Sequence, residues 1–187
     1  MARIIGIAGS LRRGSYNAAL LRAAVALAPE GAEIEVASIR GIPLYDGDLE
    51  SASGIPEPVA KLKDQIAAAD GLLIVTPEYN NSMPGVLKNA IDWLSRPSKD
   101  IRRVFGDKPV AIMGATPGGG GTRLSQSSWL PVLRTLGTRL WSGKVLYVAG
   151  AAQVFDPGGN LIDEKIRRLL TEFMAGFTRF VGGAISS

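Results

Sequence analysis

The chain contains no cysteine and no histidine. Without cysteine there can be no disulfide bonds, thiolate nucleophiles, thiolate-held zinc or iron–sulfur clusters. Histidine is the side chain that most often performs acid–base catalysis near neutral pH, and many transition-metal sites use it. We therefore expect neither a hydrolytic triad nor a metal site, and we assign no catalytic side chain. The chemistry that remains is that of a bound organic cofactor.

Long apolar runs are missing as well. No window approaches the roughly 18 apolar residues that a membrane span needs, and Met1 leads directly into a strand pattern rather than a signal peptide. We therefore expect a cytoplasmic protein without a membrane partner. The chain has 187 residues, of which 46% are hydrophobic. This length suits one compact domain, so residues 1–187 are interpreted as a single domain.

The charge balance is basic, with 21 Lys and Arg against 17 Asp and Glu. A basic protein suits an anionic ligand, but these residues are scattered as short pairs such as Arg12-Arg13 and Arg102-Arg103. Nucleic-acid binding typically needs a concentrated basic patch. We therefore expect no nucleic-acid partner and assign most of these charges to an ordinary solvated surface.

Two kinds of hydrophobic pattern alternate along the chain. Short apolar, β-branched runs predict strands at residues 3–8, 33–38, 71–76, 110–115 and 144–149. Helical spacing predicts helices at residues 17–27, 58–69, 84–95, 122–136 and 163–181. Residues 41–56 are rich in proline and glycine and are predicted as a loop. This order predicts an α/β fold, a doubly wound five-stranded parallel sheet with helices on both faces.

In an open α/β sheet, ligands bind at the carboxyl ends of the strands. The loop after the first strand leads into a helix and offers hydroxyl, guanidinium and amide groups that favour an anion such as phosphate. These groups belong to Ser10, Arg12, Ser15 and Asn17. The same residues fit equally well a serine-rich turn in which Ser15 or Asn17 caps the helix.

Two common nucleotide motifs can be tested directly. A dinucleotide fingerprint needs G-x-G-x-x-G after the first strand, whereas the glycines stand at Gly6, Gly9 and Gly14. A Walker A loop needs Gly-Lys-Ser/Thr, but Gly121 is followed by Thr122-Arg123. Neither motif is present, so dinucleotide binding of this type and nucleotide hydrolysis both lose their main support.

Three segments, in this order, resemble the NADPH-dependent FMN reductase family, which includes quinone, chromate and azo-dye reductases of flavodoxin-like fold. They are Gly9-Ser10-Leu11-Arg12 with Gly14-Ser15 and Asn17, then Thr76-Pro77-Glu78-Tyr79-Asn80, then Leu87-Lys88-Asn89-Ala90-Ile91-Asp92-Trp93-Leu94-Ser95-Arg96. The resemblance covers most of the chain. Each motif is modestly specific, but three of them in register at strand ends are not expected by chance.

The resemblance implies a set of cofactor contacts. The first loop would hold the FMN phosphate through Ser10, Arg12, Ser15 and Asn17. The second loop would lie against the isoalloxazine ring through Pro77, Glu78, Tyr79 and Asn80, although an ordinary strand-to-helix turn is its alternative. A third loop would lie on the opposite side of the flavin through Thr116, Gly118 and Gly119. Many relatives have serines there, and a flexible glycine turn is the competing interpretation.

The function implied is hydride transfer from NADPH, or NADH, through bound FMN to a small acceptor. Quinones, chromate, azo and nitro compounds and free flavin are candidate acceptors, and Arg96 is the candidate residue for steering NADPH or an anionic acceptor. We expect ping-pong kinetics and a homodimer or homotetramer. The alternatives are a non-enzymatic flavodoxin-type electron carrier, which is usually acidic, and a flavin-binding sensory module.

Overall fold

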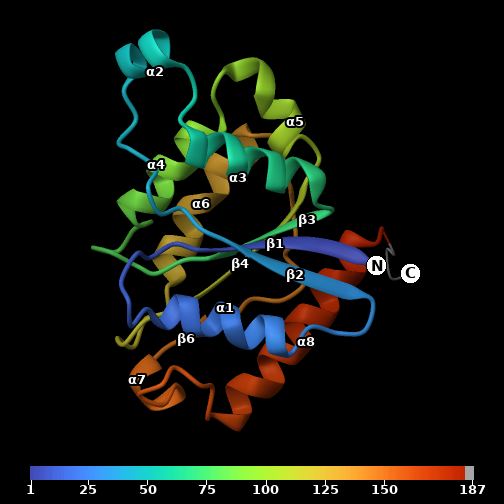
Figure 1. The fold of residues 1–187 in the computed structure, drawn as a ribbon. Coiled ribbons are helices and arrows are strands. Elements are labelled where there is room, and N and C mark those ends of the chain that lie inside the picture. Colours follow the sequence, from blue (N-terminus) through green and yellow to red (C-terminus); the bar gives the residue numbers. More distant parts are fainter. Residues whose placement is uncertain (184–187) are drawn as a thin grey trace.

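A computed structural model describes residues 1–183 of the chain, and its centre is a six-stranded parallel sheet (Figure 1). The order is β2-β1-β3-β4-β5, and β6 pairs with the far end of β4. The strands are β1 (Ala2–Ala8), β2 (Ala32–Ala37), β3 (Gly71–Val75), β4 (Pro109–Ala115), β5 (Arg139–Leu140) and β6 (Tyr147–Val148). The predicted α/β, flavodoxin-like class is confirmed, but the prediction of five strands was one short.

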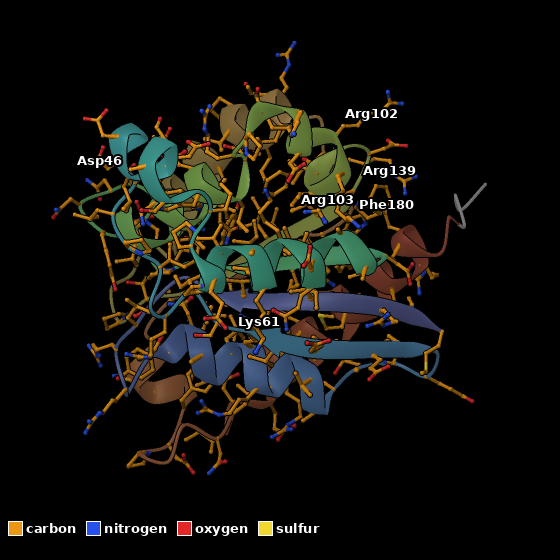
Figure 2. The ribbon with its side chains drawn as sticks, turned by 45° about the horizontal axis from the view of Figure 1, so that its top comes forward. Asp46, Lys61, Arg102, Arg103, Arg139 and Phe180 are labelled. Atoms are coloured by element: carbon orange, nitrogen blue, oxygen red, sulfur yellow. The ribbon has the colours of Figure 1, made fainter. Side chains whose placement is uncertain are left out.

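The fifth predicted strand, at residues 144–149, was wrong in length. Instead, two short strands share one edge of β4: β5 pairs with Pro109 and Val110, and β6 pairs with Gly114 and Ala115. Arg139 and Leu140 form no apolar run, so the sequence gives no strand signal there. Arg139 also places its guanidinium 5.0 Å from the centre of the Phe180 ring, which helps to hold β5 at the sheet edge (Figure 2).

The central strands are buried on both faces, which explains their continuous apolar sequences. Successive residues of β3 alternate between two core clusters, with Leu72 and Ile74 in one and Leu73 and Val75 in the other. Helices cover both faces (Figure 1). One layer contains α3 (Glu57–Ala68), α4 (Gly85–Leu94), α5 (Ile101–Phe105) and α6 (Arg123–Thr135); the other contains α1 (Tyr16–Ala26), α7 (Ala151–Val154) and α8 (Glu164–Val181).

The five predicted helices are confirmed as α1, α3, α4, α6 and α8, each within two residues of its predicted bounds. The short elements were missed. Residues 41–56, predicted as a loop, contain α2 (Gly47–Ser53), which buries none of its residues and projects at the top of Figure 1. A 3-10 turn at Ser98–Asp100, α5 and α7 were also not predicted, because helices of three to five residues are too short for periodicity to show.

Within residues 1–183, none of the helices combines the length and the apolar character that crossing a membrane would require.

The carboxyl ends of β3 and β4 approach each other unusually closely at Gly114. A Cβ atom there would lie 2.1 Å from the carbonyl oxygen of Thr76 and 2.5 Å from Oγ1 of Thr122. Thr76 and Gly114 lie at the ends of β3 and β4, and a loop that could line a site follows each of these strands. The close approach therefore decides how far apart those loops stand.

We predict that Gly114→Ala lowers the free energy of unfolding by about 1–3 kcal/mol, because the methyl group must displace backbone. Gly85→Ala is the matched control, since a Cβ there has no neighbour within 4 Å, and it should be neutral or slightly stabilising. Urea unfolding of the two variants gives the comparison. Equal stabilities would show that the ends of β3 and β4 can separate at little cost.

Candidate active site

Three loops meet at the carboxyl edge of the sheet because β1, β3 and β4 are parallel neighbours. We call residues 9–15 the first loop, residues 76–84 the second loop and residues 116–122 the third loop. The first and second loops flank the position between β1 and β3 where the strand order reverses, which is where open α/β sheets bind ligands. A hydrogen bond of 3.3 Å between Ser10 Oγ and the Tyr79 hydroxyl joins these two loops.

The first loop combines both roles that its sequence allows. Ser15 is the N-cap of α1, and its Oγ accepts from the backbone N–H of Ala18 at 3.2 Å. The first turn of α1 has no acidic residue, so nothing there opposes an anion at the positive end of the helix. Arg12 is exposed and donates to the carbonyl of Gly14 at 3.1 Å, which leaves most of its donors available.

Asn17 is buried and uses its amide inside the protein. Its Nδ2 donates to the carbonyl of Ala115 and its Oδ1 accepts from the Ala115 N–H, both at 2.9 Å. The start of α1 is thereby tied to the end of β4, where the third loop begins. A phosphate contact for Asn17 stays a prediction, and the structure adds that this residue fixes the distance between the first and third loops.

The second loop is a tight turn that projects from the sheet edge. Tyr79 and Ser82 exchange two backbone hydrogen bonds of 3.0 Å, and Asn80 and Asn81 between them have φ values of 50° and 60°. Asparagine tolerates this left-handed region better than most residues, which explains the Asn-Asn pair. Tyr79 is 46% exposed at this edge. At the base of the loop, Pro77 packs close to Gly9 of the first loop.

A buried hydroxyl network lies beneath the second loop. Thr76 Oγ1 donates to the carbonyl of Pro77 at 2.9 Å and accepts from Trp129 Nε1 at 3.2 Å. It also lies 2.9 Å from Ser125 Oγ, which must be the donor because a hydroxyl has only one hydrogen. Above this network, the Glu78 carboxylate accepts from the backbone N–H groups of Leu124 and Ser125. The second loop is therefore bonded to the first turn of α6.

The third loop contains glycines with different environments. A Cβ atom at Gly118 or Gly119 would have no neighbour within 4 Å, so these two residues border open space. Gly121, in contrast, has φ +65° and packs against Tyr147. At the start of the loop, the Thr116 N–H donates to the backbone carbonyl of Val148 at 2.9 Å. A flexible turn at Gly118 and Gly119 and close access for a ligand are thus both compatible with this geometry.

Arg96 lies outside the three loops, at the end of α4, and is already paired. Its Nε donates to Glu50 Oε2 at 2.8 Å, and its guanidinium lies 5.9 Å from the Tyr45 ring. The hydrogen bond from Arg96 lowers the pKa of Glu50 below its usual range. The Arg96 side chain is still 41% exposed. Its proposed role toward NADPH or an acceptor stays a prediction, and Glu50 would compensate part of its charge.

Sequence reasoning placed Asn89 and Trp93 in α4 and expected packing for Trp93, but it missed the contacts that these residues make with residues 43–45. Asn89 accepts from the Tyr45 N–H and donates to the carbonyl of Pro43, both at 2.8 Å, which ties the segment before α2 to α4. Trp93 also donates to that carbonyl and is fully buried, so it acts in packing. The available signal was an asparagine inside a helix, where its side chain must find a partner outside the helix backbone.

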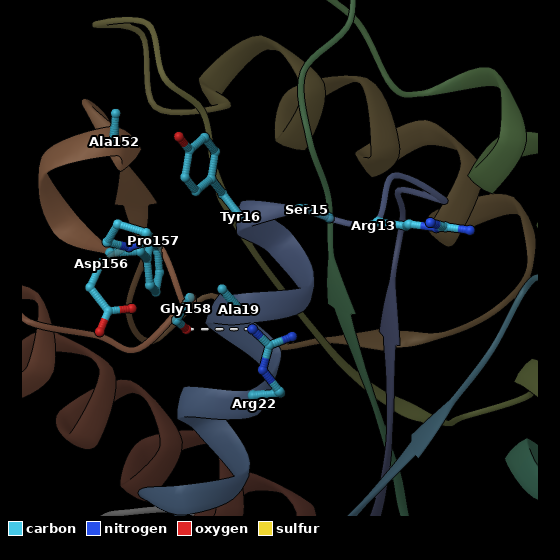
Figure 3. Close-up of a pocket in the computed structure, with 12 residues that line it drawn as sticks. Arg13, Ser15, Tyr16, Ala19, Arg22, Ala152, Asp156, Pro157 and Gly158 are labelled. Carbon is cyan, nitrogen blue, oxygen red and sulfur yellow. Dashed lines mark hydrogen bonds between the residues drawn. The ribbon is translucent and has the colours of Figure 1, made fainter.

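A separate cavity of about 360 Å³ lies between the start of α1 and residues 152–159 (Figure 3). Among its lining residues, Tyr16 and Phe155 stack with their ring centres 6.1 Å apart, and Arg22 donates to the Gly159 carbonyl at 3.5 Å. Residues 13–15 of the first loop border this cavity, but no residue of the second or third loop lines it. We therefore place the candidate active site at the three loops and not in this cavity.

We predict that Asn17→Ala lowers the free energy of unfolding by about 2–4 kcal/mol, because it leaves the buried N–H and carbonyl of Ala115 unpaired. Ser10→Ala is the matched control, since its hydroxyl is bonded only at the exposed loop surface, and its effect should stay within about 0.5 kcal/mol. Urea unfolding without added ligand measures both. Equal losses would mean that Asn17 does not fix the loops.

Known proteins resemble this chain in both sequence and fold. The family described as NADPH-dependent FMN reductase matches residues 2–153. The chain is 46% identical over 170 residues to an NAD(P)H-dependent FMN reductase of Pseudomonas aeruginosa, covering 91% of this chain and 90% of that protein. It is 43% identical over 179 residues to the 2-hydroxy-1,4-benzoquinone reductase of a Burkholderia species, covering 96% of each.

Among solved structures, the flavoenzyme NAD(P)H:(acceptor) oxidoreductase from Paracoccus denitrificans matches 98% of both chains with a TM-score of 0.87 and 34% identity. The fold and the sequence similarity lead to one conclusion. The chain belongs to the NADPH-dependent FMN reductase family.

Proposed function

We propose that this protein is an NAD(P)H-dependent FMN oxidoreductase that passes electrons to a quinone. The observation that carries the proposal is the meeting of three loops at the point where the strand order reverses between β1 and β3. Two similar proteins support the acceptor class, since one is named a 2-hydroxy-1,4-benzoquinone reductase and another a quinone reductase from Escherichia coli. Chromate, azo and nitro compounds and free flavin are further candidate acceptors.

The first loop fits the phosphate end of FMN. The first turn of α1 contains no acidic residue, and the exposed guanidinium of Arg12 can add a charge-assisted hydrogen bond. Ser15 accepts a hydrogen bond as the N-cap, so its hydroxyl hydrogen is available to a phosphate oxygen. Ser10 would supply a second hydroxyl. This donor-rich end would hold a doubly charged group at a helix start whose first turn has no acidic residue.

The second and third loops fit the ring end. Backbone N–H groups of the second loop would face the polar edge of the ring, with Tyr79 as an exposed outer wall. The open space at Gly118 and Gly119 would allow the backbone of the third loop to approach from the other side. FMN, when bound there, would supply hydride-transfer and electron-transfer chemistry.

The protein residues then have to bind and orient, and no side chain has to transfer a proton. This agrees with a chain that has neither histidine nor cysteine. Arg96 at the end of α4 would attract NADPH or an anionic acceptor, and both substrates would use the same exposed face in turn. NAD(P)H is a reductant of the cytoplasm, which is where we propose that the enzyme works.

The test is a visible spectrum of the protein saturated with FMN and mixed with NADPH, or with NADH, in the absence of oxygen. We predict bleaching of the flavin band, its return on addition of a benzoquinone, and parallel lines in initial-rate plots. FMN binding without bleaching would favour an electron carrier or a sensory module, and no FMN binding would overturn the assignment.

Arg12→Ala should raise the Kd for FMN about tenfold, because one charge-assisted hydrogen bond is lost. Arg22→Ala, beside the separate cavity, is its control.

We further propose that the protein forms a homodimer or homotetramer through the face made by α4 and α6. A largely apolar groove of about 430 Å³ lies there, and Ile91, Ile101 and Val132 contribute to its lining. The occupant would be a second copy of this chain.

For this surface, we predict that Thr135→Arg, at the exposed rim of the groove, lowers the molecular mass found by sedimentation equilibrium, because a charge would be buried without a partner. Thr171→Arg on the exposed side of α8 is the matched control and should leave the mass unchanged. A wild-type protein that sediments as a monomer would contradict the proposal.

A further inference from the structure

The first turn of α6 has no capping side chain of its own. Its N-cap residue, Thr122, is in the left-handed region with φ 67° and makes no side-chain cap bond, and no acidic residue stands in the first turn. The first N–H groups of a helix have no partner within the helix. Those of Leu124 and Ser125 are satisfied by Glu78 Oε2, at 2.9 Å and 3.1 Å. The cap of α6 thus comes from the second loop, 46 residues away in sequence from Leu124.

This contact joins two loops that face the proposed flavin site. Glu78 belongs to the second loop, and the third loop leads directly into α6 at Thr122 and Arg123. The other carboxylate oxygen of Glu78 points along the third loop, since a Cβ atom at Gly120 would lie 3.7 Å from Oε1. Backbone hydrogen bonds tie the third loop to the start of α7, since the Thr116 and Gly118 carbonyls accept from the N–H groups of Ala151 and Gly150. Glu78 is the contact that ties the end of the third loop to the second loop.

A buried hydrogen-bond network beneath Glu78 also joins the second loop to α6. Thr76, two residues before Glu78, is bonded to Ser125 and Trp129 of α6 inside the core. The second loop is therefore attached to α6 at two levels, by a buried hydroxyl below and by a carboxylate at the surface. The buried level fixes the helix against the sheet. The carboxylate bonds the first turn of the helix, next to the end of the third loop.

We propose that Glu78 is a positioning residue for the cofactor: its carboxylate holds the third loop and the start of α6 at the spacing from the second loop that FMN binding requires. Its side chain would then not be a ligand of the flavin, although its loop would lie beside the ring. This inference rests on the proposed function, because it concerns the same site. It assigns to Glu78 a role that differs from the direct ring contact implied by family resemblance.

The test uses the full-length wild type, Glu78→Ala and Glu78→Gln, each prepared with and without FMN. Hydrogen exchange of the Leu124 and Ser125 amides in the FMN-free proteins reports the contact itself. Fluorescence titration gives the Kd for FMN. Asp163→Ala is the matched control, because Asp163 caps α8 by accepting from Ile166 at 2.8 Å, away from the three loops.

We expect Glu78→Ala to speed exchange of the two amides and to raise the Kd for FMN about tenfold. Glu78→Gln retains one acceptor oxygen, so it should recover part of both effects. Asp163→Ala should change neither the exchange of those amides nor the Kd. If Glu78→Ala does not fold, Glu78→Gln supplies both readouts.

Two results would overturn the inference. A raised Kd with unchanged exchange would make Glu78 a direct flavin ligand, and faster exchange with a Kd within about twofold of wild type would make it only a helix cap. Failure of the proposed function is separate, because it appears in the wild-type titration as an absence of FMN binding, whatever the exchange data show.

Discussion

The parallel pairing of β1, β3 and β4 is the constraint on which the rest of this structure depends. Because neighbouring parallel strands end at the same edge, three loops that are far apart in sequence must meet there. The burial of β3 and β4 on both faces makes this pairing rigid. Gly114 then allows the ends of the two strands to come within a spacing that no other residue would permit.

Hydrogen bonds made by two side chains, Asn17 and Glu78, fix the positions of the loops relative to these strands. Asn17 bonds both backbone groups of Ala115, which sets the distance from α1 to the end of β4. Glu78 bonds two N–H groups of α6, which sets the distance from the second loop to the third. Both contacts pair a side chain with backbone, so the loops can vary in sequence without losing the spacing. In the proposed enzyme, this preorganisation would replace catalytic side chains, because positioning is what a flavin reaction asks of the protein.

Several polar and charged side chains considered for the site are hydrogen-bonded to other groups of the protein. The amide of Asn17, the carboxylate of Glu78 and the guanidinium of Arg96 all have protein partners. Ser10 and Arg12, in contrast, are bonded only within or between the exposed loops. The phosphate end of the site is thus the part whose donors remain most available, and the ring end relies on backbone groups and open glycines.

The sequence by itself determined the elements whose signals are local. Apolar runs and helical spacing located four of the strands and all five long helices, and residue types at the strand ends located the three loops. It could not locate β5 or α2, because two strand residues and an unburied helix of seven residues leave no periodic pattern.

Only the tertiary structure decided which partner each polar side chain has. Asn17 meets Ala115 across 98 positions and Arg96 meets Glu50 across 46, and no local pattern encodes such distances. The physical reason is that residue type determines which hydrogen bonds a side chain can make, whereas strand order and packing determine which groups stand within 3 Å of it.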